Sequence, residues 1–508
     1  MMLLVPMVVL FLPWLQSALG GRIMWLIKQQ VLQSQEQRIQ KYLLKNSNGM
    51  TEPKEGFFPQ TLDHFNRRNN GTFKQRYWVN ANLWEPRLGP VFLFIGGEHV
   101  LFSSSVLAGE HVDLAQKYRA LLVSLEHRYY GKSINPDGLT NQNLQFLSSQ
   151  QALADLATFH EFIGRQYNLT RNNRWVCFGG SYPGSLAAWF RLKFPHLAFA
   201  AVASSAPVRA QLDFTGYNKV VSQSLSNPVV GGSMKCRSAV ANAFSQLDRI
   251  MAGSNTSQLE VDFKSCQKLN GSDDRALFAC NLAGIVKGIV QNNKMMPDRN
   301  ITNLCQIMTN QSLGSVYQRL MILNKDCMDS MDLQCVDNSY QNMLTYLRST
   351  EVKPHPTSER QWYYQMCMEF GYYQSCKDKG CPFSHWATLR FELNICAKVF
   401  GIDPGSIQDA VDFTNYYYGA DHPASSRIIF VNGDIDPWHA LSVLKNQSCS
   451  EVALVINGAA HCANMSPEEE GDPPSLRQAR QKIDYQIGAW LAEDPEFQAL
   501  EDRMPCTQ

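Results

Sequence analysis

Three side chains that could together perform acyl-transfer chemistry occur in the order Ser181, Asp436 and His461, each shortly after an apolar run that ends in glycine. A serine hydroxyl is a weak nucleophile at neutral pH unless a base takes its proton. Histidine can be that base, and an aspartate can fix the histidine tautomer and stabilise the imidazolium. We therefore predict that Ser181 is a nucleophile, His461 its general base and Asp436 the residue that orients the imidazole.

The residues around Ser181 predict a strand, a sharp turn and a helix. An apolar run enters Gly179 and a second glycine, Ser181 follows, and apolar residues resume at helical spacing. This is the pattern of a nucleophile elbow, in which the next N–H, that of Tyr182, points at a developing oxyanion. The G-x-S-x-G motif is imperfect, because Pro183 stands where glycine is expected and Gly184 comes one residue later. Proline suits the first turn of a helix, so we expect the elbow to form; the alternative is an ordinary Gly-Gly turn capped by Ser181.

Another glycine turn is expected to supply a second oxyanion donor, at Gly96 or Gly97. Glu98, directly after these glycines, and Trp438, close to the predicted catalytic aspartate, are candidates for the substrate pocket.

Plainer alternatives exist for the other polar residues. Asp436 could cap a turn, and Asp434 competes with it for the catalytic role. His461 is one of eleven histidines, most of which must serve structure. His127 and Arg128, which stand beside two tyrosines, are predicted to form a structural hydrogen-bonding cluster near the site and not a second base.

Short apolar runs alternate with helical patterns in two parts of the chain, which predicts a mostly parallel, doubly wound α/β sheet. In such sheets ligands and catalytic groups collect beyond the carboxyl ends of the strands. The order Ser, Asp, His is that of α/β-hydrolases. The predicted strands cover residues 91–98, 120–125, 175–180, 199–203, 427–433 and 452–458, and the main predicted helices cover 149–167 and 475–491.

The alternation stops between residues 209 and 400, where helix formers, cysteines and polar turns dominate. We predict a helical, disulfide-containing cap domain there, inserted into a hydrolase core formed by residues 58–208 and 401–508. Residues 1–20 have the pattern of a signal peptide, with an apolar run too short to span a bilayer; a short buried helix is the alternative. Residues 21–57 are expected to be a propeptide, a flexible arm or a docking helix.

The overall composition bounds the compartment and the ligands. A net charge of +1 gives no electrostatic reason to expect nucleic-acid binding. Fourteen cysteines without the paired spacing of zinc sites predict disulfides in a secretory protein, with no metal and no cofactor. Cys177, inside a predicted strand, is expected to be a buried free thiol. The predicted glycosylation sites begin N-x-S/T triplets: Asn70, Asn168, Asn255, Asn270, Asn300, Asn310, Asn446 and Asn464.

A set of motifs spread over most of the chain is distinctive in combination: residues 58–65, 94–98 and 126–131, the elbow, and residues 436–438 and 458–461. Together they resemble the lysosomal post-proline serine peptidases, the family of prolylcarboxypeptidase and dipeptidyl peptidase II. The resemblance implies a hydrolase core with a helical cap, and a triad of Ser181, Asp436 and His461. Two departures stand out, since relatives usually have glycine in place of Pro183 and a second histidine in place of Cys462.

The leading hypothesis is a serine exopeptidase that cleaves short peptides through an acyl-enzyme. The resemblance implies a post-proline preference and peptide processing in lysosomes, endosomes or other vesicles, including processing of thymic antigen peptides; a secreted protein is the alternative. An esterase or lipase shares the same elbow and triad, because fold does not fix substrate. A weakly active binding protein on a hydrolase scaffold is the third hypothesis. Peptides are the expected partners, without an integral membrane anchor, and a homodimer is left open.

Overall fold

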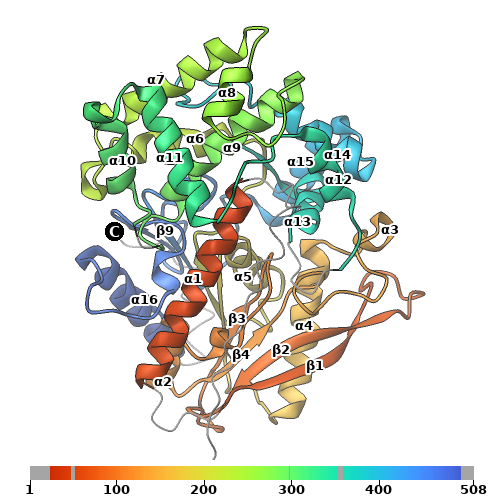
Figure 1. Cartoon of the computed structure of the whole chain (residues 1–508). Coiled ribbons are helices and arrows are strands. Elements are labelled where there is room, and N and C mark those ends of the chain that lie inside the picture. The colour runs from red at the N-terminus through yellow and green to blue at the C-terminus, as the bar shows by residue number, and fades with distance from the viewer. Residues whose placement is uncertain (1–22, 47–51, 297, 353–357, 493–508) are drawn as a thin grey trace, which may run out of the picture.

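The centre of the molecule is an eight-stranded sheet in the order β1-β2-β4-β3-β5-β6-β9-β10 (Figure 1). The structure is a computed structural model that describes residues 23–46, 52–296, 298–352 and 358–492. The β1–β2 and β2–β4 pairs are antiparallel, and the other pairs in the sheet are parallel. The strands are β1 Lys54–Thr61, β2 Thr72–Asn80, β3 Val91–Ile95, β4 Leu121–Leu125, β5 Trp175–Gly180, β6 Ala200–Ser204, β9 Ile428–Gly433 and β10 Glu451–Ile456.

The parallel strands are apolar on both faces because helices cover both. Leu93 packs in one apolar cluster with residues of α4 and α5, whereas its neighbour Phe92 packs in another with residues of α2 and α16. Continuous apolar runs are expected for strands covered in this way. The six predicted strands and the doubly wound, mostly parallel α/β-hydrolase sheet are therefore confirmed. The flanking helices are α2 Glu110–Tyr118, α3 Asn141–Leu144, α4 Ser149–Gln166, α5 Tyr182–Lys193 and α16 Pro474–Ala492.

The antiparallel edge of the sheet was not foreseen. β1 begins at Lys54, and it carries Pro59 at a position that pairs with Lys74 of β2. Proline is tolerated at the edge of a sheet, where one side of the strand needs no partner. Its polar, proline-containing sequence hid this strand among loop-like residues.

Helices dominate the chain between β6 and β9, and they form the upper layer in Figure 1. A small parallel pair, β7 Gln211–Asp213 and β8 Gly371–Tyr373, lies among them. The helices are α6 Thr215–Ser224, α7 Met234–Met251, α8 Ser257–Asp262, α9 Ser272–Gln291, α10 Ile301–Thr309, α11 Val316–Ser330, α12 Tyr340–Arg348, α13 Glu359–Gln365, α14 Leu389–Phe400 and α15 Ile407–Tyr418. Short 3-10 turns occur at η1 Ser103–Val106, η2 Pro228–Val230, η3 Gln311–Leu313, η5 Pro404–Ser406, η6 Pro437–Leu441 and η7 Ala463–Met465, and η4 Met366–Phe370 is a π-helical turn.

Disulfides fasten this helical region, as predicted from its cysteine content. The described bonds are Cys236–Cys305, Cys266–Cys335, Cys367–Cys396 and Cys376–Cys381. Cys177 is buried in β5 and unbonded, which confirms its prediction as a buried free thiol. Burial raises the pKa of this thiol to about 12, so it stays protonated.

The N-terminal helix α1 Ile23–Asn46 lies across the molecule between the helical layer and α2 (Figure 1). Ile23, Ile27 and Val31 are buried on its inner face. Gly288 of α9 makes room for this contact, because a Cβ atom there would lie 2.8 Å from Ile27. No helix within the described ranges is long and apolar enough to cross a membrane. The predicted signal peptide, residues 1–20, lies outside the described residues.

Candidate active site

The loops after β9 and β10 bring Asp436 and His461 together. His461 Nδ1 lies 2.9 Å from Asp436 Oδ2, and the aspartate side chain is fully buried. The second oxygen, Oδ1, accepts a hydrogen bond from the backbone N–H of Trp438 at 3.0 Å. Burial disfavours the charged imidazole, but the Asp436 carboxylate and the neighbouring Cys462 sulfur outweigh that effect and hold the pKa of His461 well above its ordinary value.

Asp434 has a different partner. Its Oδ1 accepts a hydrogen bond from the backbone N–H of Gly458 at 2.6 Å. Desolvation raises its pKa, although this N–H partly offsets the effect. Asp434 therefore joins the β9 and β10 loops, and Asp436 is the aspartate in contact with the imidazole.

Ser181 occupies the sharp turn between β5 and α5. Its backbone has φ 64° and ψ −133°, a conformation that L-residues rarely adopt and that characterises a nucleophile elbow. The turn is closed by hydrogen bonds from the N–H groups of Gly184 and Ser185 to the carbonyl of Ser181. Ser181 and His461 line one cavity of about 390 Å³, together with Gly97, Glu98 and Trp438.

Pro183 fits this turn because it lies in the first turn of α5, where no N–H is required. The close contacts between backbone segments at this turn are made by two nearby glycines. A Cβ atom on Gly179 would lie 2.2 Å from the Pro183 carbonyl oxygen, and one on Gly184 would lie 2.8 Å from the Ser204 carbonyl oxygen. Gly184 thus makes the close contact with β6 that the shifted motif requires.

Of the two glycines considered as oxyanion donors, Gly97 remains available. The N–H of Gly96 donates to the carbonyl oxygen of Leu125 at 2.9 Å and is consumed by the sheet. Gly97 lies against the elbow itself, since a Cβ atom there would lie 2.2 Å from Pro183 Cγ.

The side chain of Tyr182 is held by a polar cluster behind the elbow. Its hydroxyl lies 2.9 Å from His127 Nε2 and accepts a hydrogen bond from Gln365 Nε2 at 3.1 Å. His127 Nδ1 lies 2.7 Å from the carbonyl oxygen of Arg128. Burial lowers the pKa of His127 to about 4, so this imidazole is neutral, and both of its ring nitrogens are occupied by partners other than a carboxylate.

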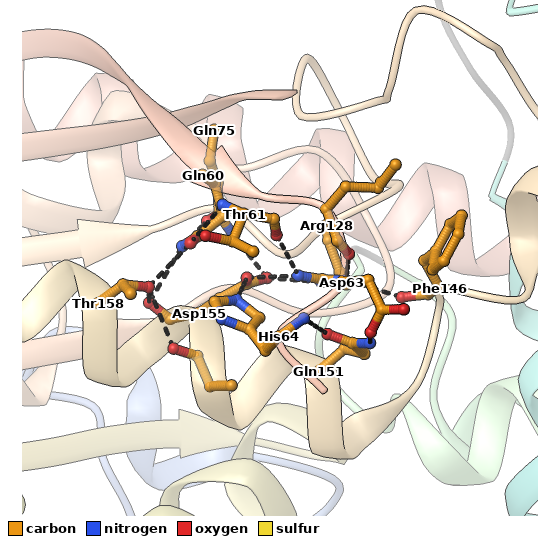
Figure 2. A network of polar contacts seen from close by, with 12 residues as sticks. Gln60, Thr61, Asp63, His64, Gln75, Arg128, Phe146, Gln151, Asp155 and Thr158 are labelled. Atoms are coloured by element: carbon orange, nitrogen blue, oxygen red, sulfur yellow. Dashed lines mark hydrogen bonds and ion pairs between the residues drawn. The ribbon is translucent and has the colours of Figure 1, made fainter. Parts of the chain in front are cut away.

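Arg128 anchors the same segment in a buried network, shown in Figure 2. Its guanidinium makes a two-point contact with Asp155, at 2.7 Å and 2.5 Å, and also donates to the carbonyl oxygens of Leu62 and Phe146. His64 Nε2 lies 2.8 Å from the same carboxylate. This network holds the strand-end segment of His127 in place, which agrees with the structural role expected from sequence.

Glu98 and Trp438 both line the cavity, and each side chain is held by a hydrogen bond to a different helix. Trp438 Nε1 donates to Gln291 Oε1 of α9 at 3.0 Å. Glu98 Oε1 accepts a hydrogen bond from Lys28 Nζ of α1 at 2.7 Å. Burial alone would raise the pKa of Glu98, but Lys28 and His99 lower it to about 2, so the carboxylate is ionised.

Sequence reasoning missed Lys28 and Gln291. Both reach the cavity from helices far away in the chain, and neither carries a motif that marks it. Within the described ranges, no group of three or more His, Cys, Asp or Glu side chains is placed to hold a metal ion.

The family model for serine carboxypeptidase S28 matches residues 60–483, most of the chain. The chain belongs to this family. It is similar to human thymus-specific serine protease, with 43% identity over 446 residues that cover 86% of this chain and 87% of the relative. The mouse protein of the same name is 42% identical over 448 residues, covering 87% and 88%. Human lysosomal Pro-X carboxypeptidase is 27% identical over 452 residues, covering 86% and 88%.

Membership of the S28 family makes the chain a serine-type peptidase and confirms the resemblance found in its sequence. Pro183 and Cys462, at which the sequence departs from the pattern that the resemblance implies, both line the cavity. Pro183 contacts Gly97, and Cys462 places its sulfur near the elbow, where a Cβ atom on Gly180 would lie 2.9 Å from it. Cys462 is also fixed by its backbone N–H, which donates to Ser205 Oγ at 2.8 Å.

The predicted glycosylation sites of this S28 peptidase differ in exposure. Asn70, Asn168, Asn255, Asn270, Asn310 and Asn446 are exposed and Asn300 is half-buried. Asn464 is buried, and its Nδ2 atom donates to Glu110 Oε2 at 2.7 Å and to Ser204 Oγ at 2.9 Å. Because a glycan would have to be attached at this same nitrogen, the prediction for Asn464 is wrong for the folded protein.

Proposed function

We propose that this protein is a serine exopeptidase in which Ser181, His461 and Asp436 form the catalytic triad. Ser181 Oγ attacks the scissile carbonyl carbon while His461 Nε2 takes the hydroxyl proton, and Asp436 retains the Nδ1–H bond and stabilises the imidazolium. The N–H groups of Gly97 and Tyr182 stabilise the oxyanion. His461 then gives its proton to the leaving amine, and water hydrolyses the acyl-enzyme by the same steps.

The contact between His461 Nδ1 and Asp436 Oδ2 at 2.9 Å carries this proposal. A histidine bonded to a carboxylate through Nδ1 presents Nε2 to its other side. Ser181 lines the same cavity at a strained turn, which is the position that a nucleophile requires.

The proposed substrates are short peptides, with a preference for cleavage after proline in an endosomal or lysosomal lumen. The similarity to human lysosomal Pro-X carboxypeptidase supports this preference. Aromatic rings line the cavity, among them Trp362, Tyr372 and Trp438, and they offer an apolar surface on which a proline ring can pack.

Covalent labelling tests the nucleophile. A fluorophosphonate probe should label the purified mature protein once per chain, and Ser181→Ala should abolish the label while circular dichroism and thermal unfolding remain like wild type. Labelling of Ser181→Ala at the same stoichiometry would show that another residue is the nucleophile.

A peptide library, followed by mass spectrometry of the products, tests the exopeptidase assignment. Release of residues from one end, with proline before the cut, is the expected result. Cuts without a fixed relation to either end would reject it, and faster turnover of acyl esters than of any peptide would favour an esterase.

A further inference from the structure

Helix α1 forms one wall of the active-site cavity and places a cation in it. Trp25 and Lys28 of α1 line the cavity together with Ser181 and His461. α1 precedes the residues matched by the family model, which begin at 60, so this wall is an addition to the matched part of the chain.

Lys28 is held in one orientation by its surroundings. Its Nζ lies 2.7 Å from Glu98 Oε1, 5.0 Å from the centre of the Trp25 ring and 5.9 Å from that of Trp362. An ammonium between a carboxylate and aromatic faces is stabilised by both. The lysine stem is therefore fixed before any substrate arrives.

The ion pair presents its cation, not its anion, to the cavity. The side chain of Lys28 is 30% exposed and that of Glu98 is 5% exposed. An ammonium has three N–H donors, and the bond to Glu98 uses one of them. The part of the pair that a ligand can reach is thus a positively charged hydrogen-bond donor, which fits a carboxylate ligand. Glu98 Oε2 is buried with no hydrogen-bond partner among the described residues, so the anion of the pair is turned away from the cavity.

The Lys28–Glu98 ion pair is next in the chain to the proposed oxyanion donor. Glu98 follows Gly97, the proposed oxyanion donor, and consecutive Cα atoms are about 3.8 Å apart. The ion pair therefore lies next in the chain to the turn proposed to hold the scissile carbonyl, and in the same cavity as Ser181 and His461.

We propose that Lys28, fixed by Glu98, binds the α-carboxylate of the peptide substrate, so that the protein acts on the C-terminal end of peptides. This inference rests on the proposed function of the Ser181 site and specifies which end of the peptide is read. Lys28 is accordingly a specificity-determining residue supplied by α1, and Glu98 positions it.

A matched pair of substrates tests the inference, namely N-acetyl-Ala-Pro-Phe as the free acid and as the C-terminal amide. Wild type should cleave the acid with kcat/KM at least about tenfold higher than the amide, the scale of one charge-assisted hydrogen bond. Lys28→Met keeps the apolar stem but removes the charge, so it should abolish this preference by slowing cleavage of the acid much more than cleavage of the amide. Lys28→Arg should retain part of the preference, and Glu98→Gln should weaken it.

Two controls separate this role from a general effect on folding or charge. Lys41→Met removes an exposed lysine from the same helix and should change neither substrate. Lys287→Met removes another lysine that lines the cavity; loss of acid preference there, with retention in Lys28→Met, would overturn the inference. An unchanged acid-to-amide ratio in Lys28→Met would also overturn it.

Binding separates this inference from the catalytic proposal. Calorimetry on Ser181→Ala should show tighter binding of the acid than of the amide, and Lys28→Met in that background should remove the difference. Failure of fluorophosphonate labelling in wild type would reject the proposed nucleophile while this binding difference still supports Lys28. Equal binding of acid and amide to Ser181→Ala would reject the role of Lys28 even in an active enzyme.

Discussion

Pro183 and Gly97 are complementary in shape, since the proline ring fills the space that a side chain at residue 97 would need, with 2.2 Å left between Cγ and a Cβ atom built there. The two residues belong to the two turns that are proposed to supply the oxyanion donors. The proline ring therefore packs between these turns, and it does so without straining α5, because an N–H at that position would have no intrahelical partner.

Replacing Pro183 with glycine, the residue that the family resemblance leads us to expect there, should change turnover little. We expect Pro183→Gly to raise the acylation rate by less than about tenfold, roughly 1.4 kcal/mol of barrier, because the elbow is already formed. The variant should unfold at a slightly lower temperature, since glycine gives the unfolded chain more freedom. Active-site titration and thermal unfolding measure the two effects. A hundredfold activation would show that Pro183 holds the wild-type site nearly silent.

A methyl group at residue 97 should be far more harmful. Gly97→Ala forces its Cβ against the proline ring, so the turn must move away from the elbow; we expect acylation to fall by about 10²-fold or more, the scale of losing one oxyanion donor. Pro183→Gly removes the obstructing ring and should restore part of the activity in the double variant. Additive losses in the four-member cycle of acylation rates would contradict a direct contact between these residues.

The two aspartates after β9 should respond differently to the same isosteric change. Asp436→Asn leaves the packing intact but removes the carboxylate that fixes the His461 tautomer, so kcat should fall by about 10³–10⁴-fold. Asp434→Asn weakens its bond to the Gly458 N–H and should mainly lower the free energy of unfolding, by about 1–2 kcal/mol. Steady-state kinetics and denaturant unfolding on both variants separate the roles. Equal losses of kcat would leave the triad aspartate unassigned.

The raised pKa of His461 predicts how activity depends on pH. The imidazole acts as a base only when neutral, so kcat/KM of wild type should rise with pH, with a midpoint at higher pH than an ordinary histidine would give. Asp436→Asn removes the carboxylate that raises this pKa, and the remaining effect of burial should shift the rise to lower pH. A pH profile of residual activity in this variant that coincides with wild type would show that another group controls the rise.

Protonation of His461 should also change the free energy of unfolding in a predictable direction. A pKa raised in the folded state contributes stability that is complete below the unfolded pKa of about 6.5 and is lost as pH rises through the folded pKa. The difference in free energy of unfolding between wild type and Asp436→Asn should therefore be larger at pH 6 than at pH 9. Urea unfolding at the two pH values measures it, and a difference that grows with pH would contradict the proposed charge pairing.

The sequence allowed prediction of the parts of the fold in which local pattern and burial agree. Strands such as Val91–Ile95 are apolar on both faces, and Ser181 stands between such a strand and a helix, so their positions followed from the pattern of residues alone. The same reasoning could not decide between Gly96 and Gly97, because the decisive fact is the hydrogen bond from Gly96 to Leu125 on a neighbouring strand.

Long-range contacts explain the features of the site that could not be predicted from the sequence. Asn464 satisfies a glycosylation pattern, but its amide is buried between Glu110 and Ser204, which lie hundreds of residues earlier. Lys28 lies in a weakly patterned N-terminal segment, and its place beside Glu98 depends on how α1 packs against α9. Neither contact leaves a periodic signal in the residues nearby.

The first two disulfides of the helical region overlap along the chain, since Cys236 pairs with Cys305 and Cys266 pairs with Cys335. During vectorial synthesis Cys177, Cys236, Cys266 and Cys280 all emerge before Cys305 and Cys335, so pairing in order of emergence would join Cys236 and Cys266 to wrong partners. The native bonds therefore require these two thiols to wait or a wrong bond to be exchanged. Maturation of this peptidase should accordingly depend on a thiol-disulfide isomerase more than on the speed of oxidation.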